Sequence, residues 1–146
     1  MKTNIIYNKD CIEGMKELPD ESIDLVITDP PYGISYQSNY KQVKFKKLQN
    51  DDNLNWFLDF SKQVYRVLKN NTSLFLFTRA DKIGLMMDNL ISVGFKFKNM
   101  LIIPTANPTS CGDLSASFVN CFEVVLFFNK GRNKFRKTDL KKTSES

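Results

Sequence analysis

The sequence predicts an α/β fold in which helices flank a mostly parallel β-sheet. Three observations support this prediction. Residues 23–28 are a run of mainly apolar and β-branched side chains, as in a strand that is covered on both faces. Residues 56–68 place apolar side chains at helical spacing. Strand-like and helix-like segments then alternate along the chain, which is typical of right-handed crossovers between parallel strands.

Five short apolar runs are predicted to be strands. They are residues 5–7, 23–28, 73–78, 95–103 and 118–128. The stretches 33–50 and 104–117 show no clean period and are predicted to be loops. Asp10 and Asp29 each follow a predicted strand. Because ligands bind beyond the carboxyl ends of the strands in such sheets, both side chains are expected on the same rim.

Two shorter helices have recognisable ends. Residues 11–18 are predicted as a helix because Asp10 can cap its first turn and Pro19 ends it. Residues 81–93 are predicted as another helix, because Gly94 can adopt the positive φ that closes a last turn.

The longest predicted helix follows Asp51 or Asp52, either of which is a suitable N-cap. It is expected to end at Asn70. Its apolar side chains recur at helical spacing and are Trp56, Phe57, Phe60, Val64, Val67 and Leu68. That spacing predicts that the three aromatic rings pack in the core and do not form a stacking platform for a ligand.

The composition is that of one small globular domain. The chain has 146 residues, of which 42% are apolar and twelve are Phe, enough for a real core. Its net charge of +5 and isoelectric point near 9.1 permit a polyanionic partner without proving one.

Several classes of protein are excluded by the same composition. The sequence has no His, so Ser-His-Asp and Cys-His nucleophilic schemes are excluded, and no metal site is expected. Cys11, Cys111 and Cys121 show no CxxC spacing, so a reduced, cytoplasmic setting is expected. No run approaches the roughly 18 apolar residues of a membrane span, and no signal peptide is recognisable.

The tetrapeptide Asp29-Pro30-Pro31-Tyr32 directly follows the predicted strand 23–28. Its two prolines fix φ and donate no hydrogen bonds, so the carbonyls around them can face a ligand. Methylation of an exocyclic amino nitrogen needs such a turn, because oxygen acceptors hold the amine and a flat ring stacks on the extruded base. The alternative is a turn that only terminates the strand. The apolar strand before it and Gly33 after it favour the functional interpretation.

The tetrapeptide resembles the signature of DNA amino-methyltransferases that use S-adenosylmethionine, in its adenine-N6 form. Residues 8–24, 73–78 and 122–131 also resemble segments of this family, in the order of its β-type members. The resemblance implies a Rossmann-like, doubly wound sheet of the S-adenosylmethionine-dependent methyltransferase type. It also implies double-stranded DNA as the substrate, in a restriction-modification or phage setting.

The resemblance assigns roles to the residues of the turn. Asp29 accepts from the target amine, Pro30 offers a backbone carbonyl, and Tyr32 stacks on the base, with Pro31 as part of the same catalytic turn. Asp at the first position resembles adenine-N6 enzymes, whereas Ser there is commoner in cytosine-N4 enzymes. Methylation of cytosine N4 or of RNA, and a basic DNA-binding module without catalysis, stay open as alternatives.

Cofactor contacts are implied for Asp10, Cys11 and Asp29. In the family, the acidic residue at the position of Asp10 recognises the adenine of the methyl donor, with the following backbone N–H assisting. From the sequence alone, an ordinary helix N-cap is an equally good interpretation of Asp10.

The predicted loop after the turn is basic and aromatic. Its lysines are Lys41, Lys44, Lys46 and Lys47, and they alternate with Tyr36, Tyr40 and Phe45. A solvated loop is the ordinary explanation, but long loops without secondary structure are uncommon in compact domains unless they are functional. A DNA-facing loop, with the lysines on phosphates, is therefore slightly favoured.

The family's glycine-rich FxGxG segment, and the stretch that precedes it, are not found in the sequence. In members of this order both lie downstream of the turn that contains Gly131. The prediction is therefore a partial catalytic domain over residues 1–128 and a basic, disordered tail over residues 129–146. The strand 23–28 would then be an exposed edge of an incomplete sheet. The chain is expected to be inactive alone, as a fragment or as one half of a split enzyme with a complementing C-terminal half.

Overall fold

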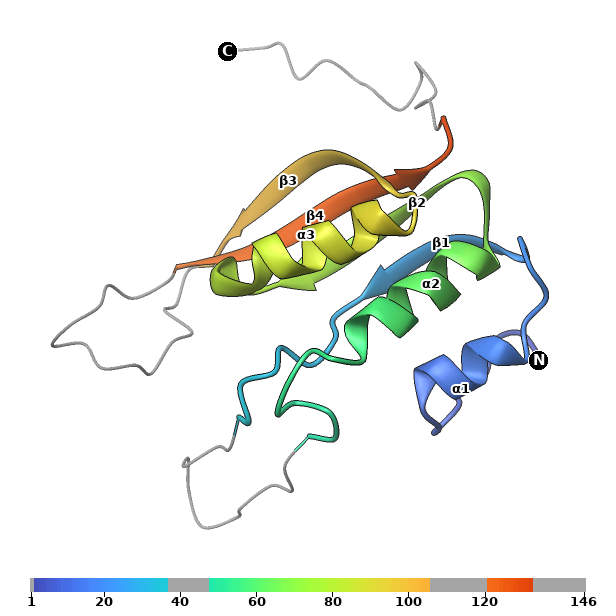
Figure 1. The fold of residues 1–146 in the computed structure, drawn as a ribbon, viewed down its shortest axis with the longest axis horizontal. Helices are drawn as coiled ribbons and strands as arrows, with labels where there is room; N and C mark the ends of the chain where they lie inside the picture. The colour runs from blue at the N-terminus through green and yellow to red at the C-terminus, as the bar shows by residue number, and fades with distance from the viewer. Residues whose placement is uncertain (1, 37–47, 106–120, 133–146) are drawn as a thin grey trace, which may run out of the picture.

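The computed structural model describes residues 2–36, 48–105 and 121–132. The elements, in chain order, are α1 (Cys11–Lys16), β1 (Ile23–Thr28), α2 (Phe57–Val67), β2 (Leu68–Thr78), the short 3-10 helix η1 (Ala80–Lys82), α3 (Ile83–Ser92), β3 (Lys96–Pro104) and β4 (Phe122–Lys130) (Figure 1). The predicted α/β class is confirmed.

The described strands form one sheet in the order β1-β2-β4-β3. β1 and β2 are parallel, whereas β4 is antiparallel to both β2 and β3. Three of the four described strands, β1, β2 and β3, therefore run in the same direction, which confirms the expected mostly parallel sheet, and β4 makes the sheet mixed. The reason lies in the connections: the α3 crossover returns the chain so that β3 runs in the direction of β2. The chain then reverses, and β4 lies between β2 and β3, antiparallel to both.

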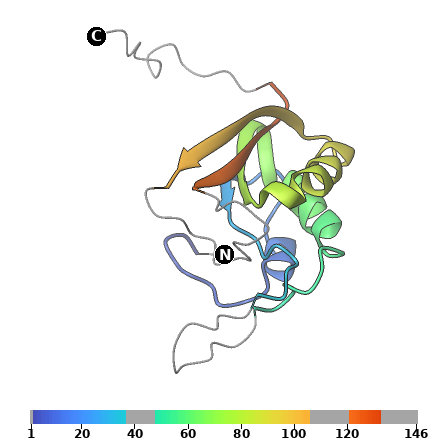
Figure 2. The ribbon, with the colours of Figure 1, turned by 90° about the vertical axis from the view of Figure 1, so that its left-hand side faces the viewer.

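The described helices lie on one face of the sheet. Figure 1 shows α2 and α3 side by side across the strands, and Figure 2 shows both helices on the same side of the sheet. The core between the helices and the sheet contains Phe57, Phe60, Val64, Leu74, Leu76, Met86, Leu90, Leu126 and Phe128. Phe57 and Phe60 thus occupy the core as predicted, while Trp56 is only partly buried against it.

The opposite face of the sheet has no helix over it within residues 2–36, 48–105 and 121–132. On β1, Leu25 and Ile27 remain 47% and 64% exposed. In the middle of this face Phe75 stacks on Phe127, with ring centroids 4.7 Å apart. Among the strands of the described residues, β1 is the terminal one, at the position where the sequence predicts an exposed edge. The described part of the domain therefore has an apolar face and a sheet edge on the same strand.

Helix ends follow the predicted signals at α1 and α3. Asp10 is the N-cap of α1, as expected. Gly94 follows the C-cap of α3 with φ +110, and a Cβ there would lie 3.0 Å from the ring of Tyr65. Glycine is therefore required at this position both by its backbone conformation and by the neighbouring ring.

Two predictions about the N-terminal half are wrong. Residues 5–7 form no strand, and Ile6 is 99% exposed, because no described strand lies beside them to share hydrogen bonds. The N-cap of α2 is Trp56 without a side-chain cap, so neither Asp51 nor Asp52 caps this helix.

The end of β4 differs from the predicted boundary at residue 128. The strand continues to Lys130, whose side chain is almost fully buried. Its ammonium donates to the carbonyl oxygens of Tyr65 and Leu68, at 2.8 and 2.7 Å, and lies 4.8 Å from the centre of the Tyr65 ring. These carbonyls end α2, where a cation is favoured by the helix dipole. Residues 133–146 of the predicted tail lie outside the described residues.

Candidate active site

The turn Asp29-Pro30-Pro31-Tyr32 lies directly beyond the carboxyl end of β1, as predicted. Pro30 is buried, Pro31 and Tyr32 are partly buried, and Asp29 is exposed. The prolines thus anchor the turn to the domain, while the carboxylate of Asp29 remains accessible at the rim of the sheet.

Asp29 and Tyr32 are hydrogen-bonded to each other. The hydroxyl of Tyr32 donates to Oδ1 of Asp29, and the ring of Tyr32 packs partly against the hydrophobic core. Burial, and secondly the hydrogen bond and charge of Asp29, raise the pKa of the Tyr32 hydroxyl well above its ordinary value. The two side chains with predicted roles in base binding are therefore brought together, and the Tyr32 hydroxyl occupies the acceptor oxygen of Asp29.

The backbone after the turn packs closely on the segment before α2. Gly33 has φ +69, and a Cβ there would lie 3.0 Å from the carbonyl carbon of Asn53 and 3.1 Å from Cγ of Leu54. Glycine is therefore needed for both conformation and space. The backbone of Gly33 thus lies close to the chain that leads into α2.

Asp51 is a residue of this site that the sequence analysis assigned wrongly, as a helix cap. Its buried carboxylate accepts hydrogen bonds from the backbone N–H groups of Gly33, Ile34 and Tyr36. The sequence contains no local signal for this role; it is the observed start of α2 at Phe57 that shows Asp51 to be too far away to cap the helix.

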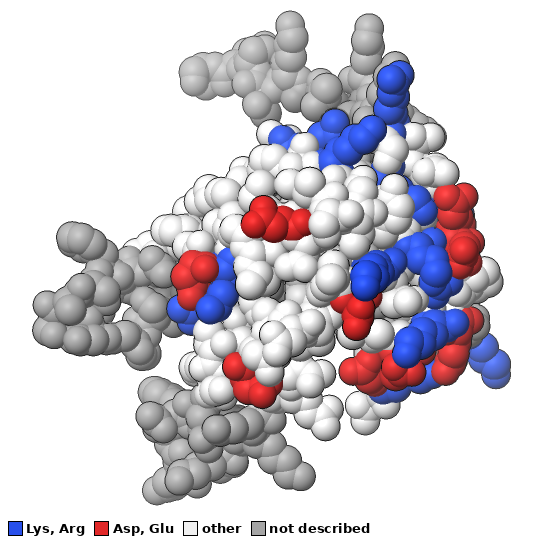
Figure 3. All heavy atoms as spheres, viewed as in Figure 1, with Lys and Arg blue, Asp and Glu red and all other residues white. Residues whose placement is uncertain are grey.

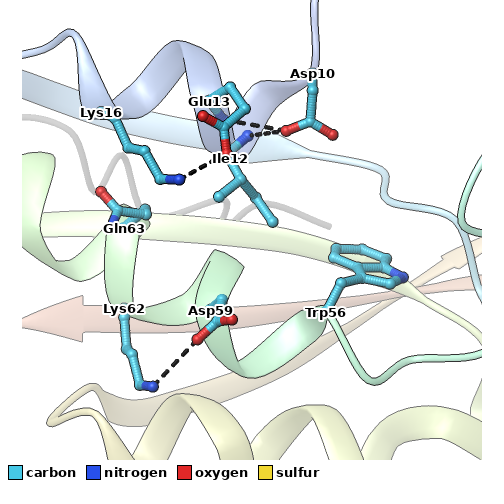
Figure 4. A pocket seen from close by; sticks show the side chains of 8 residues that line it. All are labelled: Asp10, Ile12, Glu13, Lys16, Trp56, Asp59, Lys62 and Gln63. Carbon is cyan, nitrogen blue, oxygen red and sulfur yellow. Dashed lines mark hydrogen bonds and ion pairs between the residues drawn. The ribbon is translucent and has the colours of Figure 1, made fainter.

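A pocket of about 570 Å³ lies between α1 and α2. Its lining residues are Asp10, Ile12, Glu13, Lys16, Trp56, Asp59, Lys62 and Gln63 (Figure 4). Asp10 and Trp56 lie at the same end of it. The indole N–H of Trp56 donates to the carbonyl oxygens of Asn50 and Asn53, on either side of Asp51. The segment 50–56 therefore binds the residues after the turn through Asp51 and lines one end of the pocket through Trp56.

Asp10 has the geometry of an ordinary N-cap. Its Oδ1 accepts from the backbone N–H groups of Ile12 and Glu13, at 2.9 and 3.1 Å. Both bonds use Oδ1, so Oδ2 is the oxygen that can serve a ligand. Cys11 is exposed and does not line the pocket. Partial desolvation, and secondly the charge of Asp10, raise the pKa of its thiol.

The predicted DNA-binding residues Lys41, Lys44, Lys46 and Lys47 lie outside the described residues. On the face shown in Figure 3, basic and acidic side chains of the described residues gather at one side and interleave. Ion pairs such as Lys62–Asp59 and Lys69–Asp24 also bring the two charges together among the described residues. The helical face of the domain is therefore not a uniformly basic surface.

Residues 2–36, 48–105 and 121–132 show no sign of a metal site or of a membrane-spanning helix. They contain no group of three or more Cys, Asp or Glu side chains that could hold a metal ion. Their helices are also too short or too polar for any of them to cross a membrane.

Known proteins with the same fold are methyltransferases. The structure of the cytosine-N4-specific PvuII DNA methyltransferase matches with a TM-score of 0.69 at 20% identity, over 96% of this chain and 54% of that one. The complex of M1.HpyAVI with SAM matches with a TM-score of 0.62 at 22% identity, over 92% and 59%. These likenesses define the class: the chain has the Rossmann-like α/β fold of methyltransferases.

Sequence comparison gives the family. The model described as DNA methylase, of the N6/N4 methyltransferases, matches residues 23–146. The Type II methyltransferase M.HinfI of Haemophilus influenzae is 31% identical over 147 residues, 90% of this chain and 40% of the relative. M.BamHI of Bacillus amyloliquefaciens is 28% identical over 98 residues, 67% of this chain and 22% of the relative. The chain therefore belongs to the N6/N4 DNA methylase family, and it spans less than half the length of these relatives.

Proposed function

We propose that this chain carries the catalytic turn of an S-adenosylmethionine-dependent DNA methyltransferase that modifies the N6 amino group of adenine. The observation that supports this most is the pairing of Asp29 with Tyr32 at the carboxyl end of β1, in a chain of the DNA methylase family. An exposed carboxylate beside an aromatic ring is what recognition of an extruded aminopurine requires.

In this proposal the turn works by positioning. The amino group of the target base replaces the Tyr32 hydroxyl as the donor to Asp29, and the carbonyl of Pro30 accepts from its second hydrogen. The nitrogen lone pair then projects from the plane of the base. Tyr32, released from Asp29, stacks on the base. The contribution of the chain is orientation and charge complementarity, and no covalent bond to the protein is needed.

The pocket between α1 and α2 fits part of the methyl donor. It offers a carboxylate oxygen on Asp10, the indole of Trp56 and the apolar side chain of Ile12, a combination that suits a nucleoside. When bound, S-adenosylmethionine supplies an electrophilic methyl group. We assign Asp10 to its nucleoside, with Cys11 and Asp29 as further contacts from the chain.

Adenine is proposed as the target because Asp29 stands where cytosine-N4 enzymes more often have Ser. Cytosine N4 is the second candidate, because the cytosine-N4-specific PvuII enzyme has the same fold. The exocyclic amines of the two bases present the same hydrogens to the turn, so only the identity of the product separates the two proposals.

Double-stranded DNA is the proposed partner in the cytoplasm. Lys41, Lys44, Lys46 and Lys47 follow the turn in the sequence, where lysine contacts with phosphates would hold the duplex near the extruded base. Such contacts add affinity without sequence information.

We further propose that the active enzyme contains a second segment, equivalent to the downstream part of the relatives. This chain covers 40% of M.HinfI. The apolar face at Leu25 and Ile27 and the open edge of β1 are the surfaces that such a segment would cover. It would also supply the glycine-rich wall of the donor pocket.

The test is a methyl-transfer assay with labelled S-adenosylmethionine and duplex DNA, followed by digestion and identification of the modified nucleoside. The chain is assayed alone, and joined to the downstream part of M.HinfI. N6-methyladenine formed only by the joined protein is the expected result. N4-methylcytosine would replace the adenine proposal, and methylated RNA under the same conditions would replace the DNA proposal. DNA binding without any transfer would favour a non-catalytic DNA-binding module.

A further inference from the structure

Every backbone N–H from Gly33 to Tyr36 is bound by a single residue, Asp51. Oδ1 of its carboxylate accepts from Gly33 at 3.0 Å and from Ile34 at 3.4 Å, and Oδ2 accepts from Tyr36 at 2.7 Å. The N–H of Ser35 donates to the main-chain carbonyl of Asp51. The loop that follows the catalytic turn is thus held by the side chain and the main-chain carbonyl of one residue, Asp51.

The carboxylate of Asp51 is buried as well as fully engaged. The residue is 3% exposed, and a buried charge is costly unless hydrogen bonds compensate it. Burial alone raises the pKa of Asp51, but backbone donors from Tyr36, Ile34, Gly33 and Tyr32 outweigh it and keep the pKa below its ordinary value. The backbone N–H groups of the loop therefore stabilise the charged form of the Asp51 carboxylate, and that carboxylate in turn holds the loop.

This loop continues the catalytic turn directly in the chain. Gly33 follows Tyr32 with a positive φ, in a space where a Cβ would lie 3.0 Å from the carbonyl carbon of Asn53 and 3.1 Å from Cγ of Leu54. The prolines at positions 30 and 31 donate no hydrogen bonds that could hold the turn from the other side. Tyr32 lies between the prolines and this loop, and its hydroxyl donates to Asp29.

We propose that Asp51 is a positioning residue for the base-binding turn: by holding residues 33–36 it keeps the ring of Tyr32 and the carboxylate of Asp29 in register for the extruded base. This inference rests on the proposed function of the turn. Asp51 itself touches neither the base nor the methyl donor.

The experiment compares the full chain with three variants, Asp51→Ala, Asp51→Asn and Asp52→Asn. Asn at position 51 keeps one oxygen for Gly33 and Ile34 but turns an NH₂ group toward the N–H of Tyr36. Asp52 is the exposed neighbour of Asp51 and serves as the matched control. Thermal unfolding at each pH establishes the range of temperature and pH in which each variant is folded.

The first readout is the ionisation of Tyr32, followed by NMR of tyrosine labelled at the ring carbon that bears the hydroxyl. In the wild-type chain and in Asp52→Asn, Tyr32 should stay neutral at pH of about 11, one unit above the ordinary tyrosine pKa. In Asp51→Ala it should ionise near the ordinary value, with Asp51→Asn between. A role of Asp51 in fold stability alone would lower the unfolding temperature and leave the Tyr32 titration unchanged, and that result would overturn the proposal.

The second readout uses each variant joined to the downstream part of M.HinfI. It is the affinity for a fluorescently labelled duplex that carries adenine opposite an abasic site, measured by fluorescence anisotropy. Loss of hydrogen bonds to a charged group predicts a decrease on the order of tenfold to a hundredfold in Asp51→Ala. Equal affinities for Asp51→Ala and the wild type would also overturn the proposal. If the wild-type joined protein does not bind the base, the proposed function fails, while the Tyr32 titration still decides whether Asp51 positions the turn.

Discussion

The Tyr32 hydroxyl donates its hydrogen bond to Oδ1 of Asp29, so the predicted stacking ring and the predicted amine acceptor are partners within one turn. A base that enters this site must provide a donor to replace the hydroxyl. An exocyclic amine does so, whereas a carbonyl at the same position would meet the carboxylate with a second acceptor. Under the proposed function, this pairing would therefore favour amino groups over carbonyl groups at the site.

Substitutions at Tyr32 separate the ring from its hydroxyl. Tyr32→Phe keeps the ring and frees Asp29, so binding of an extruded adenine by the joined protein should be at least as tight as in the wild type. Tyr32→Ala removes the stacking surface, which is worth about 1–3 kcal/mol per base, and affinity should decrease by on the order of tenfold to a hundredfold. The measurement is a fluorescence anisotropy titration with the duplex described above. Equal losses in both variants would assign the effect to the hydroxyl and contradict stacking by the ring.

Substitutions at Asp10 separate its cap from its proposed role in donor binding. Asp10→Asn keeps an acceptor for the N–H groups of Ile12 and Glu13, so unfolding should change little, whereas Asp10→Ala should cost about 1 kcal/mol. Both variants lose the charged acceptor and should bind S-adenosylmethionine more weakly in the joined protein, measured by calorimetry. Wild-type affinity in Asp10→Asn would show that Asp10 is a helix cap only.

The acid stability of the domain should depend on Asp51. Its pKa is lowered in the folded state, so its contribution to stability is present above the unfolded-state pKa, about 3.9, and is lost as pH decreases through the lower folded-state value. Chemical unfolding from pH 7 to about pH 2 should show this loss in the wild type and in Asp52→Asn. Asp51→Asn should be less stable at neutral pH and should lack this part of the pH dependence. Parallel curves for all three proteins would contradict the assignment.

The apolar face of the sheet should make the isolated chain self-associate. Replacing Leu25 with Lys puts a charge on this face and should reduce both association and the binding of a hydrophobic dye. Leu85→Lys is the control, because Leu85 is 48% exposed on α3, on the opposite side of the sheet. Sedimentation velocity gives the masses. The idea fails if the control reduces association as much as Leu25→Lys does.

The sequence predicted most of the fold where local signals were strong. Helical spacing and Gly94 located α2 and α3, and the apolar run 23–28 located β1 with its turn. The direction of β4 was not predictable in the same way, because apolar runs of parallel and antiparallel strands look alike when both faces are covered. The supposed strand at residues 5–7 failed because pairing depends on a neighbour that the local sequence does not contain.

The candidate active site, too, was predictable only where its residues lie close together in the sequence. Asp29 and Tyr32 are adjacent in the sequence and form one turn, so a short motif was enough to find them together. The role of Asp51 depends on contacts across an intervening loop of the chain, with Gly33 and Tyr36, and no local pattern encodes those contacts. A capping residue and a loop-binding carboxylate are the same residue type, so only the distance from Asp51 to the start of α2 distinguished them.

The most direct test of the central claim is the rate of methyl transfer to adenine N6 by the chain joined to the downstream part of M.HinfI, with Asp29 intact and with Asp29→Ala. Asp52→Ala, an exposed carboxylate outside the turn, is the control. We predict that transfer is abolished in Asp29→Ala and retained in the control, while DNA binding is similar in all three proteins. Transfer at the wild-type rate without the Asp29 carboxylate would show that this turn does not hold the target amine.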